Sequence, residues 1–269
     1  MKKKTLLLVP YLTALVAVAH AQTPAPAVAP EPSPFTANVS VTTNYKFRGQ
    51  DQGSNKPALQ GGFDWSMNGF YLGNWNSSIG FTNSGLEMDF YGGYKGTISD
   101  GFGYDVGLLQ YYYPQKSREV SFNTTELYGA LTYQFVTLKY SHTVSKDYFG
   151  FGEAGEEAGL GYRLKGRGTG YLEANASFPL VDRLTLNAHV GYTRYSSDLR
   201  NARATVDTGG GVTTTVDTAV PNFYDYRIGL AYDLGSGFSV SAAVAGANKR
   251  GFYGDINKTR GILTISKAM

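Results

Sequence analysis

Apolar and polar residues alternate along most of the chain from Phe35 onward. In the first stretch Ala37, Val39, Val41, Thr43, Tyr45 and Phe47 share one face, and Asn38, Ser40, Thr42, Asn44, Lys46 and Arg48 share the other. A period of two residues is that of a β-strand. The pattern predicts strands at about 36–48, 58–66, 70–80, 86–95, 103–113, 125–133, 135–144, 170–178, 184–194, 224–234, 238–248 and 260–269, with boundaries good to about two to four residues.

The connections between these strands are alternately short and long. The short ones are Met67-Asn68-Gly69, Gly96–Phe102, Gln134, Pro179–Arg183 and Gly235-Ser236-Gly237. The long ones are Gly49–Pro57, Phe81–Gly85, Pro114–Thr124, Ser145–Thr169, Tyr195–Phe223 and Lys249–Thr259. A strand crosses a membrane only in a sheet closed on itself, because an unpaired peptide group in lipid has no water to bond. The sequence therefore predicts an all-β fold, a transmembrane antiparallel up-and-down β-barrel of about 12 strands, with short periplasmic turns and longer extracellular loops.

Aromatic positions separate this prediction from a soluble lipid-carrier barrel, whose apolar face points inward. Two sets of aromatic residues share parity with the apolar face, one at each end of the strands. Near the short turns these are Trp65, Tyr71, Tyr94, Tyr104, Tyr133, Phe178, Tyr232 and Phe238. Near the long loops they are Tyr45, Phe47, Phe81, Tyr112, Tyr140, Tyr192 and Tyr226. Two such belts are typical of a membrane-facing surface, where Tyr and Trp place an apolar body and a polar tip at the headgroups.

The N-terminal residues predict export. Residues 1–21 combine three lysines, a short apolar core and the small-residue triplet Ala19-His20-Ala21, which is typical of a cleaved secretory signal peptide. Residues 22–34 hold five of the ten prolines and predict an extended periplasmic tether. The barrel then occupies 35–269. Removing the signal changes the balance from 24 basic and 21 acidic residues to 21 of each, so no nucleic-acid partner is expected.

Other chemistries find little support. The chain has no cysteine, which excludes disulfides and thiolate metal sites. The acids of Ser145–Thr169, namely Asp147, Glu153, Glu156 and Glu157, lack the spacing of a metal-binding loop and are interpreted as solvated charges. Gly209-Gly210-Gly211 lacks the lysine and the strand-to-helix setting of a phosphate-binding loop. We expect no metal, no cofactor and no catalytic residue: His142 near Ser141 and Ser145 has no third orienting group, and His189 is expected to contact Glu173 or Asn175 structurally.

The polar faces of the strands supply the candidate pore lining. Ionised groups in such numbers need water or one another, and about twelve strands enclose a wider bore than eight. The candidate pore-lining residues are Lys46, Arg48, Asp64, Asn74, Asn76, Glu87, Asp89, Asp105, Tyr111, Glu126, Lys139, Glu173, Asn175, His189, Asp225 and Arg227; Lys95, Tyr113, Asn187 and Asp233 share their parity. Acids outnumber bases among them, which favours cations or neutral solutes. Salt bridges within the wall, such as Lys46 or Arg48 with Glu87 or Asp89, explain the same charges equally well.

The segments in their order resemble the TorF-type porin family, formerly described as proteobacterial proteins of unknown function. They are SVTTNYKFRGQ (40–50), PALQGGFDW (57–65), GFYLGNWNSSIG (69–80), LEMDFYGGYKG (86–96), YDVGLLQYYYP (104–114), ELYGALTY (126–133), YLEANASFPL (171–180), LTLNAHVGYTRY (184–195) and YDYRIGLAYDLG (224–235). The resemblance implies a Gram-negative outer-membrane porin but no substrate and no functional residues. Gln50-Asp51-Gln52 and the terminal Met269, where the assembly signal usually has Phe, depart from the family pattern.

The primary hypothesis is a porin in the outer membrane that passes small hydrophilic solutes or ions by diffusion. Its expected partners are outer-membrane lipid, lipopolysaccharide and the outer-membrane assembly machinery. The alternative is a closed structural or adhesive barrel whose extracellular loops bind a partner or lipopolysaccharide. The solute, the pore radius, the oligomeric state and the place of Ser145–Thr169 relative to the bore stay open at this point.

Overall fold

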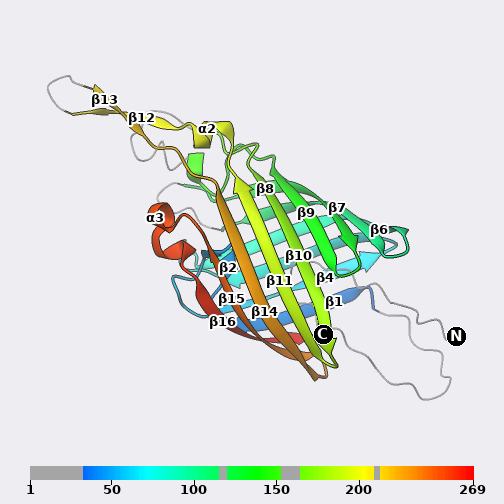
Figure 1. The fold of residues 1–269 in the computed structure, drawn as a ribbon. Helices are drawn as coiled ribbons and strands as arrows, with labels where there is room; N and C mark the ends of the chain where they lie inside the picture. The colour runs from blue at the N-terminus through cyan, green and yellow to red at the C-terminus, as the bar shows by residue number, and fades with distance from the viewer. Residues whose placement is uncertain (1–32, 115–119, 153–163, 209–212) are drawn as a thin grey trace, which may run out of the picture.

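Twelve strands of the computed structural model form one antiparallel sheet that closes on itself (Figure 1). The structure describes residues 33–114, 120–152, 164–208 and 213–269. The barrel strands are β1 (Phe35–Thr42), β4 (Ala58–Met67), β5 (Phe70–Ser78), β6 (Leu86–Ser99), β7 (Phe102–Tyr112), β8 (Thr124–Tyr133), β9 (Val136–Thr143), β10 (Gly170–Val181), β11 (Leu184–Arg194), β14 (Phe223–Gly235), β15 (Phe238–Ala247) and β16 (Arg260–Ala268). The predicted 12-strand barrel is confirmed. The signal segment 1–21 and almost all of the tether 22–34 lie outside the described residues.

The barrel closes between its first and last strands. Thr42 of β1 lies opposite Ala58 of β4 on one side and opposite Thr264 of β16 on the other. The remaining barrel strands pair with their sequence neighbours. Every barrel strand therefore has a hydrogen-bonded partner on both sides, which is the condition for a sheet in lipid.

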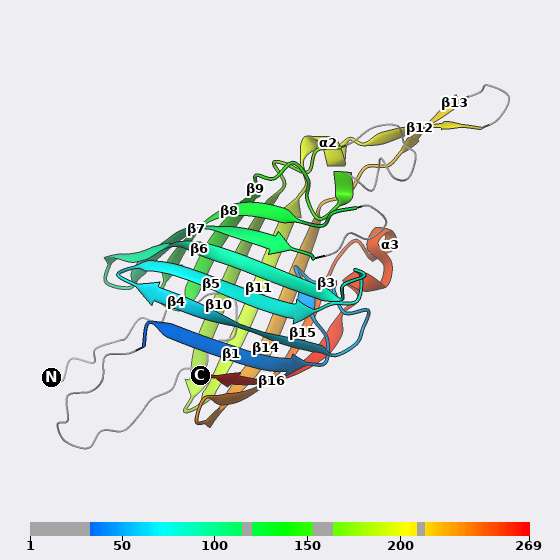
Figure 2. The same ribbon diagram turned by 180° about the vertical axis from the view of Figure 1, so that it is seen from behind.

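One end of the barrel carries two-residue turns, and the C-terminus lies at this turn end (Figure 2). Asn68 and Gly69 have φ of 52° and 85°, and Ser236 and Gly237 have φ of 53° and 78°. Two successive positive φ values match the right-handed twist of the strands that such turns join. The expected turn at Gly96–Phe102 is too wide, because β6 continues to Ser99 through a β-bulge.

The other end, the loop end, carries the longer connections and the short elements. These are β2 (Lys46–Phe47), β3 (Gln50–Asp51), α2 (Ser197–Arg200), β12 (Arg203–Asp207), β13 (Thr213–Asp217), α3 (Arg250–Tyr253) and η1 (Gly254–Asn257). The β12–β13 hairpin projects beyond the barrel (Figure 1). No helix in the described part of the chain is long and apolar enough to span a membrane.

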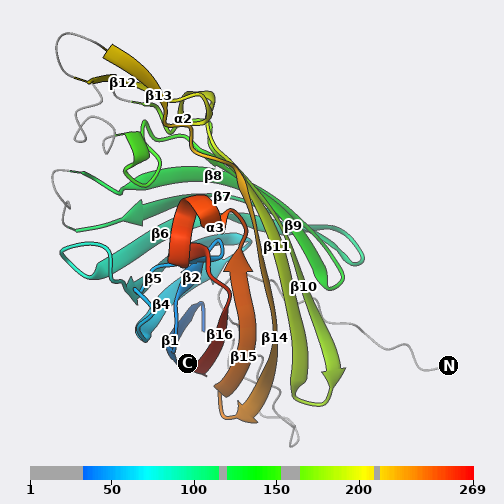
Figure 3. The ribbon, with the colours of Figure 1, turned by 60° about the vertical axis from the view of Figure 1, so that its left-hand side comes forward.

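The first expected strand, 36–48, is too long. β1 ends at Thr42, and the chain leaves the barrel wall before Lys46. Residues 46–51 then form a separate hairpin in which Lys46 pairs with Asp51 and Phe47 with Gln50. We call β2, β3 and their turn the inner hairpin, because Figure 3 shows β2 within the ring of strands.

Large apolar side chains cover the outer wall of the barrel. Phe63, Leu72 and Ile228 are each more than half exposed. Others on the same face are Val41, Leu59, Val106, Leu127, Leu131, Leu138, Val190, Leu263 and Ile265. The exposed aromatic residues at the two ends include Tyr133, Tyr232, Phe238, Tyr112, Tyr140 and Tyr226. An apolar surface that encircles the molecule exceeds what water-exposed proteins carry.

Strand β5 faces opposite to the sequence prediction. Asn74 lies directly between Phe63 and Phe90, two residues that are 59% and 45% exposed, so Asn74 is on the outer wall, and Asn76 shares its parity. Tyr71 instead points inward, where it is buried. Tyr45 and Phe47, also expected in an aromatic belt, belong to the inward-folded 43–57 connection and contact inward-facing side chains.

Inward-facing tyrosines lie over glycines of neighbouring strands. A Cβ atom at Gly93 would meet the Tyr71 hydroxyl, one at Gly107 the Tyr128 hydroxyl, and one at Gly191 the Tyr171 hydroxyl. The missing side chains leave room for the rings against the wall. Large aromatic residues are thereby held close to the wall.

Candidate functional site

The strand register shows which predicted pore-lining residues face inward. Twelve of them share the inner face of the barrel wall: Asp64, Glu87, Asp89, Asp105, Tyr111, Glu126, Lys139, Glu173, Asn175, His189, Asp225 and Arg227. Lys46 and Arg48 come from the inner hairpin instead of the wall, and the inward position expected for Asn74 and Asn76 is wrong. The sequence analysis missed Tyr71, Tyr128, Tyr148, Tyr171 and Arg260, which also contact or face the interior.

Arg48 joins the inner hairpin to the far wall. Its Nη1 and Nη2 atoms donate to the two carboxylate oxygens of Glu126 at 3.0 and 2.8 Å, and Nη1 also donates to the Tyr148 hydroxyl at 3.0 Å. The guanidinium carbon lies 4.1 Å from the ring centroid of Tyr171 and 4.8 Å from that of Phe47. The fork of the guanidinium matches a carboxylate in two parallel bonds, which is the strong form of such a pair. The expected partners Glu87 and Asp89 are wrong for Arg48.

The turn of the inner hairpin is tightly constrained. Arg48 has φ of 47° and Gly49 has φ of 74°, the left-handed region that a two-residue hairpin turn requires. A Cβ atom at Gly49 would lie 2.5 Å from the Gly246 carbonyl oxygen and 2.6 Å from Asp225 Cβ. The hairpin therefore spans from Glu126 on β8 to the wall formed by β14 and β15.

Two tyrosines hold a second buried carboxylate, that of Glu87. The hydroxyl of Tyr45 donates to Glu87 at 2.7 Å, and the hydroxyl of Tyr113 donates at 2.6 Å. Beside them the Phe47 ring packs edge-on against Tyr111 and Phe149. Side chains from the 43–57 connection thus fill the interior next to β6 and β7.

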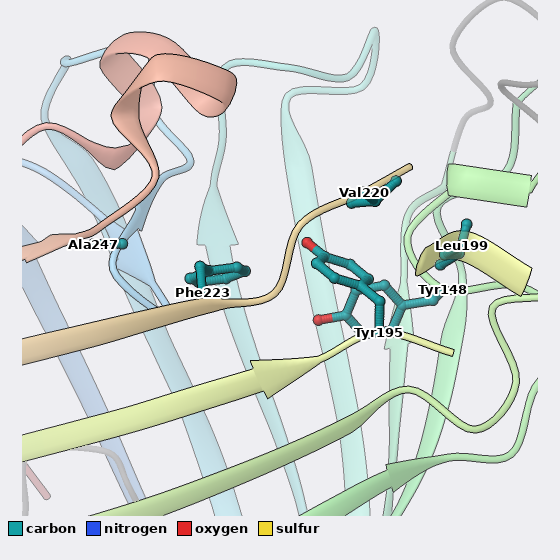
Figure 4. Close-up of a cluster of buried hydrophobic side chains, with 6 residues drawn as sticks. All are labelled: Tyr148, Tyr195, Leu199, Val220, Phe223 and Ala247. Atoms are coloured by element: carbon teal, nitrogen blue, oxygen red, sulfur yellow. The ribbon is translucent and has the colours of Figure 1, made fainter. Parts of the chain in front are cut away.

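The described part of Ser145–Thr169 also contributes to the closure of the loop end. Tyr148 packs against Tyr195, which in turn packs against Phe223, and this cluster also contains Leu199, Val220 and Ala247 (Figure 4). Asp147 accepts from the backbone N–H groups of Tyr148 and Gly152 at 2.7 and 2.8 Å. Glu153, Glu156 and Glu157, expected as solvated acids, and Gly209-Gly210-Gly211 lie outside the described residues.

His189 is the centre of a polar network on β10, β11 and β14. Its Nε2 lies 2.8 Å from Asp225 Oδ1, and its Nδ1 lies 2.7 Å from Asn175 Oδ1 and 3.5 Å from a Glu173 oxygen. The Tyr171 hydroxyl donates to both Asp225 oxygens at 3.1 Å. The expected contact of His189 with Glu173 and Asn175 is present. His142, by contrast, lies on the outer face 3.1 Å from the Tyr140 hydroxyl.

The inward acids are more deeply buried toward the loop end than toward the turn end. Glu87, Glu126 and Asp225 are at most 3% exposed. At the turn end Asp64 and Asp105 are partly exposed; the buried Tyr71 donates to Asp105 at 2.5 Å, and Tyr91 donates to Asp64 at 2.6 Å. The inner hairpin and the cluster around Tyr195 close the interior at the loop end in this conformation.

The inward charges are predominantly acidic. The acids are Asp64, Glu87, Asp89, Asp105, Glu126, Glu173, Asp225 and Asp233. The bases in the described interior are Arg48, Lys95, Lys139, Arg227 and Arg260. Lys46 is not among them, because its ammonium donates to the carbonyls of Ile256 and Lys258 at 2.8 Å beside η1. The acidic excess expected from the sequence is therefore present, but Arg260 takes the place of Lys46 among the bases.

Comparison with known proteins gives the family of the chain. The sequence model of a bacterial family of unknown function, Gcw_chp, matches residues 26–262. The chain belongs to the Gcw_chp family. No curated protein matches this Gcw_chp member in sequence.

Solved porin structures share its fold. The KdgM porin superposes with a TM-score of 0.52 at 9% identity, covering 86% of this chain and 98% of that chain. The NanC porin gives a TM-score of 0.51 at 9% identity with the same coverage. A further KdgM structure, with a TM-score of 0.52, holds that porin in complex with disordered oligogalacturonate. This Gcw_chp protein is therefore a porin-like β-barrel.

Proposed function

We propose that this protein is a diffusion channel in the outer membrane of a Gram-negative bacterium, passing small hydrophilic solutes or ions with a preference for cations and neutral solutes. The observation that carries the proposal is a closed barrel with an apolar outer wall and a charged interior. Lipid accounts for the outer wall, and the charged inner face is explained by an aqueous path. The TorF relationship, export by residues 1–21, and contacts with the assembly machinery and lipopolysaccharide are parts of the same proposal.

The acidic interior supports the selectivity. Carboxylates around a bore attract cations and repel anions. The KdgM porin, which has been solved in complex with disordered oligogalacturonate, shares the fold at 9% identity, so its ligand gives no guide to this interior. We propose that polyanions are poor solutes for this channel.

Planar bilayers test the proposal. The full processed chain, folded in detergent, should give stepwise current that rises with salt concentration, with a reversal potential on the cation side in a salt gradient. Glu87→Lys and Asp89→Lys should each shift that potential toward anions. Asp198→Lys, which changes the same charge on exposed helix α2, should leave it in place. Absence of current from a folded sample would refute the channel.

A second function, a closed structural or adhesive barrel, is favoured by one observation. The inner hairpin and the cluster around Tyr195 fill the interior at the loop end. The β12–β13 hairpin projects outward, and β13 is exposed. Binding of folded protein to lipopolysaccharide-coated surfaces, lost when 203–217 is replaced by a short Gly-Ser turn, together with zero conductance, would establish this function instead.

A further inference from the structure

The carboxylate of Asp89 has no counter-charge among the residues that the structure describes. Asp89 is 8% exposed, and its Oδ1 has no hydrogen-bond partner among the described residues. Its neighbours on the inner face, Glu87 and Glu126, are also acids. Both of those acids are satisfied, one by two tyrosine hydroxyls and the other by Arg48. A buried acceptor with no partner carries a free-energy cost, which is larger when the acceptor is charged.

Aromatic rings flank this carboxylate on both sides. Trp75 on β5 and Tyr111 on β7 are the residues directly opposite Asp89, and all three face inward. The inward-folded connection adds two rings: Tyr45 meets Trp75 edge-on with centroids 5.5 Å apart, and Phe47 meets Tyr111 at 5.4 Å. Carboxylate and rings together form what we call the Asp89 site.

The Arg48 contact shows what such an arrangement holds. There a carboxylate, Glu126, and the rings of Phe47 and Tyr171 surround a guanidinium that comes from the chain itself. The Asp89 site has the same components, an anion between aromatic rings, but the described residues supply no cation. Ring faces attract cations through their quadrupole, most strongly where water is excluded.

We propose that the Asp89 site binds the protonated amino group of a small organic cation, with an ammonium N–H donating to Asp89 Oδ1 and the alkyl part against Trp75 and Tyr111. A coordinated metal ion fits less well, because no group of three or more His, Asp or Glu side chains is placed to hold one in the described chain. The inference deepens the proposed channel function and rests on it for the route of the ligand. It names small primary amines as a solute class.

Trp75 provides the readout. The chain has two tryptophans, and Trp65 lies on the outer wall opposite Leu72, so Trp65→Phe leaves Trp75 as the sole tryptophan reporter. Folded Trp65→Phe protein in detergent is titrated at constant ionic strength with methylammonium chloride, with tetramethylammonium chloride and with NaCl. Methylammonium should give a saturable change in Trp75 emission. Tetramethylammonium, which has no N–H donor, should bind about tenfold more weakly or worse, and NaCl should give no saturable change.

Asp89→Asn in the Trp65→Phe background should weaken methylammonium binding by about tenfold or more. The matched control is Asp64→Asn, an inward acid at the turn end bound by Tyr91, which should leave binding unchanged. Equal affinity with and without Asp89, or equal responses to methylammonium and tetramethylammonium, would overturn the proposal. The second comparison needs no variant at Asp89, so it holds even if Asp89→Asn fails to fold.

Two further outcomes are distinct. If Trp75 emission titrates with pH in an Asp89-dependent way and methylammonium has no effect between pH 5 and 9, then a proton occupies the site and the proposal is wrong. If methylammonium does not bind but the same preparation conducts in planar bilayers, then the Asp89 site fails while the channel function stands.

Discussion

The contact of Arg48 with Glu126 is expected to control the position of the inner hairpin. Glu126→Gln removes the negative charge and leaves the guanidinium buried among Phe47, Tyr171 and Tyr148. The two side chains are only 6% and 2% exposed, so solvent does little to screen the loss. Removing one partner of a buried ion pair costs about 3–5 kcal/mol. At about 1.4 kcal/mol per factor of ten, this lowers the equilibrium constant for the inserted position of the hairpin by roughly two to four powers of ten.

Single-channel recording and hydrogen exchange measure this shift together. Glu126→Gln should raise the conductance or the open fraction, and the amides of residues 46–51 should exchange faster. Glu173→Gln is the control, because Glu173 is also a buried inward acid but contacts Asn175 and His189 instead of the hairpin. The charge swap Arg48→Glu with Glu126→Arg should restore part of the protection. Unchanged conductance and unchanged exchange in Glu126→Gln would refute the role of this ion pair.

Three further variants test the backbone, the outer wall and a titrating group. Gly49→Ala should destabilise the inner hairpin by about 1–2 kcal/mol from its left-handed φ alone, and more from the clash with the Gly246 carbonyl, as seen by faster proteolysis within 43–57. Leu127→Arg on the outer wall should lower the free energy of unfolding by about 2–4 kcal/mol in a lipid-refolding urea titration, whereas Thr132→Arg on the inner face should change it far less. Burial lowers the pKa of Lys46 from 10.5 to about 8. Between these pH values the unfolded chain binds more protons than the folded chain, so the free energy of unfolding, relative to that of Lys46→Met, should rise from pH 7 to pH 10. A fall over this range would contradict the lowered pKa of Lys46.

The sequence predicts the barrel well because each wall strand has an apolar outer face and a more polar inner face. Eleven strand positions need only small boundary changes, since the apolar face and the polar face differ in almost every pair of residues. The first strand fails beyond Thr42, because Tyr45 and Phe47 keep the alternation while the chain has already turned inward. Alternation shows only that a segment has two different faces. It does not distinguish a wall strand from the inner hairpin, whose residues alternate in the same way.

Strand β5 shows a second limit. Its polar residues Asn74 and Asn76 suggest the interior, but amides on the outer wall find partners: Asn74 donates to the Asp89 carbonyl and Asn76 to Asn74. The tyrosine inside finds the Asp105 carboxylate. The sequence does hold a signal for the correct orientation: Phe70 and Leu72 share one face of β5, and Tyr71 lies on the other. The partner of Arg48 lies 78 residues away, which no local pattern reveals.

The seam between β1 and β16 has a consequence for biogenesis. Thr42 and Thr264, whose hydroxyls bond at 3.0 Å, are 222 residues apart in the chain, so the ring becomes complete only when its two most distant strands meet. Any shorter fragment would expose two edge strands to the bilayer, each with a row of unpaired peptide groups. Insertion should accordingly be all-or-none and slow, and the pairing of β1 with β16 should be its rate-limiting step.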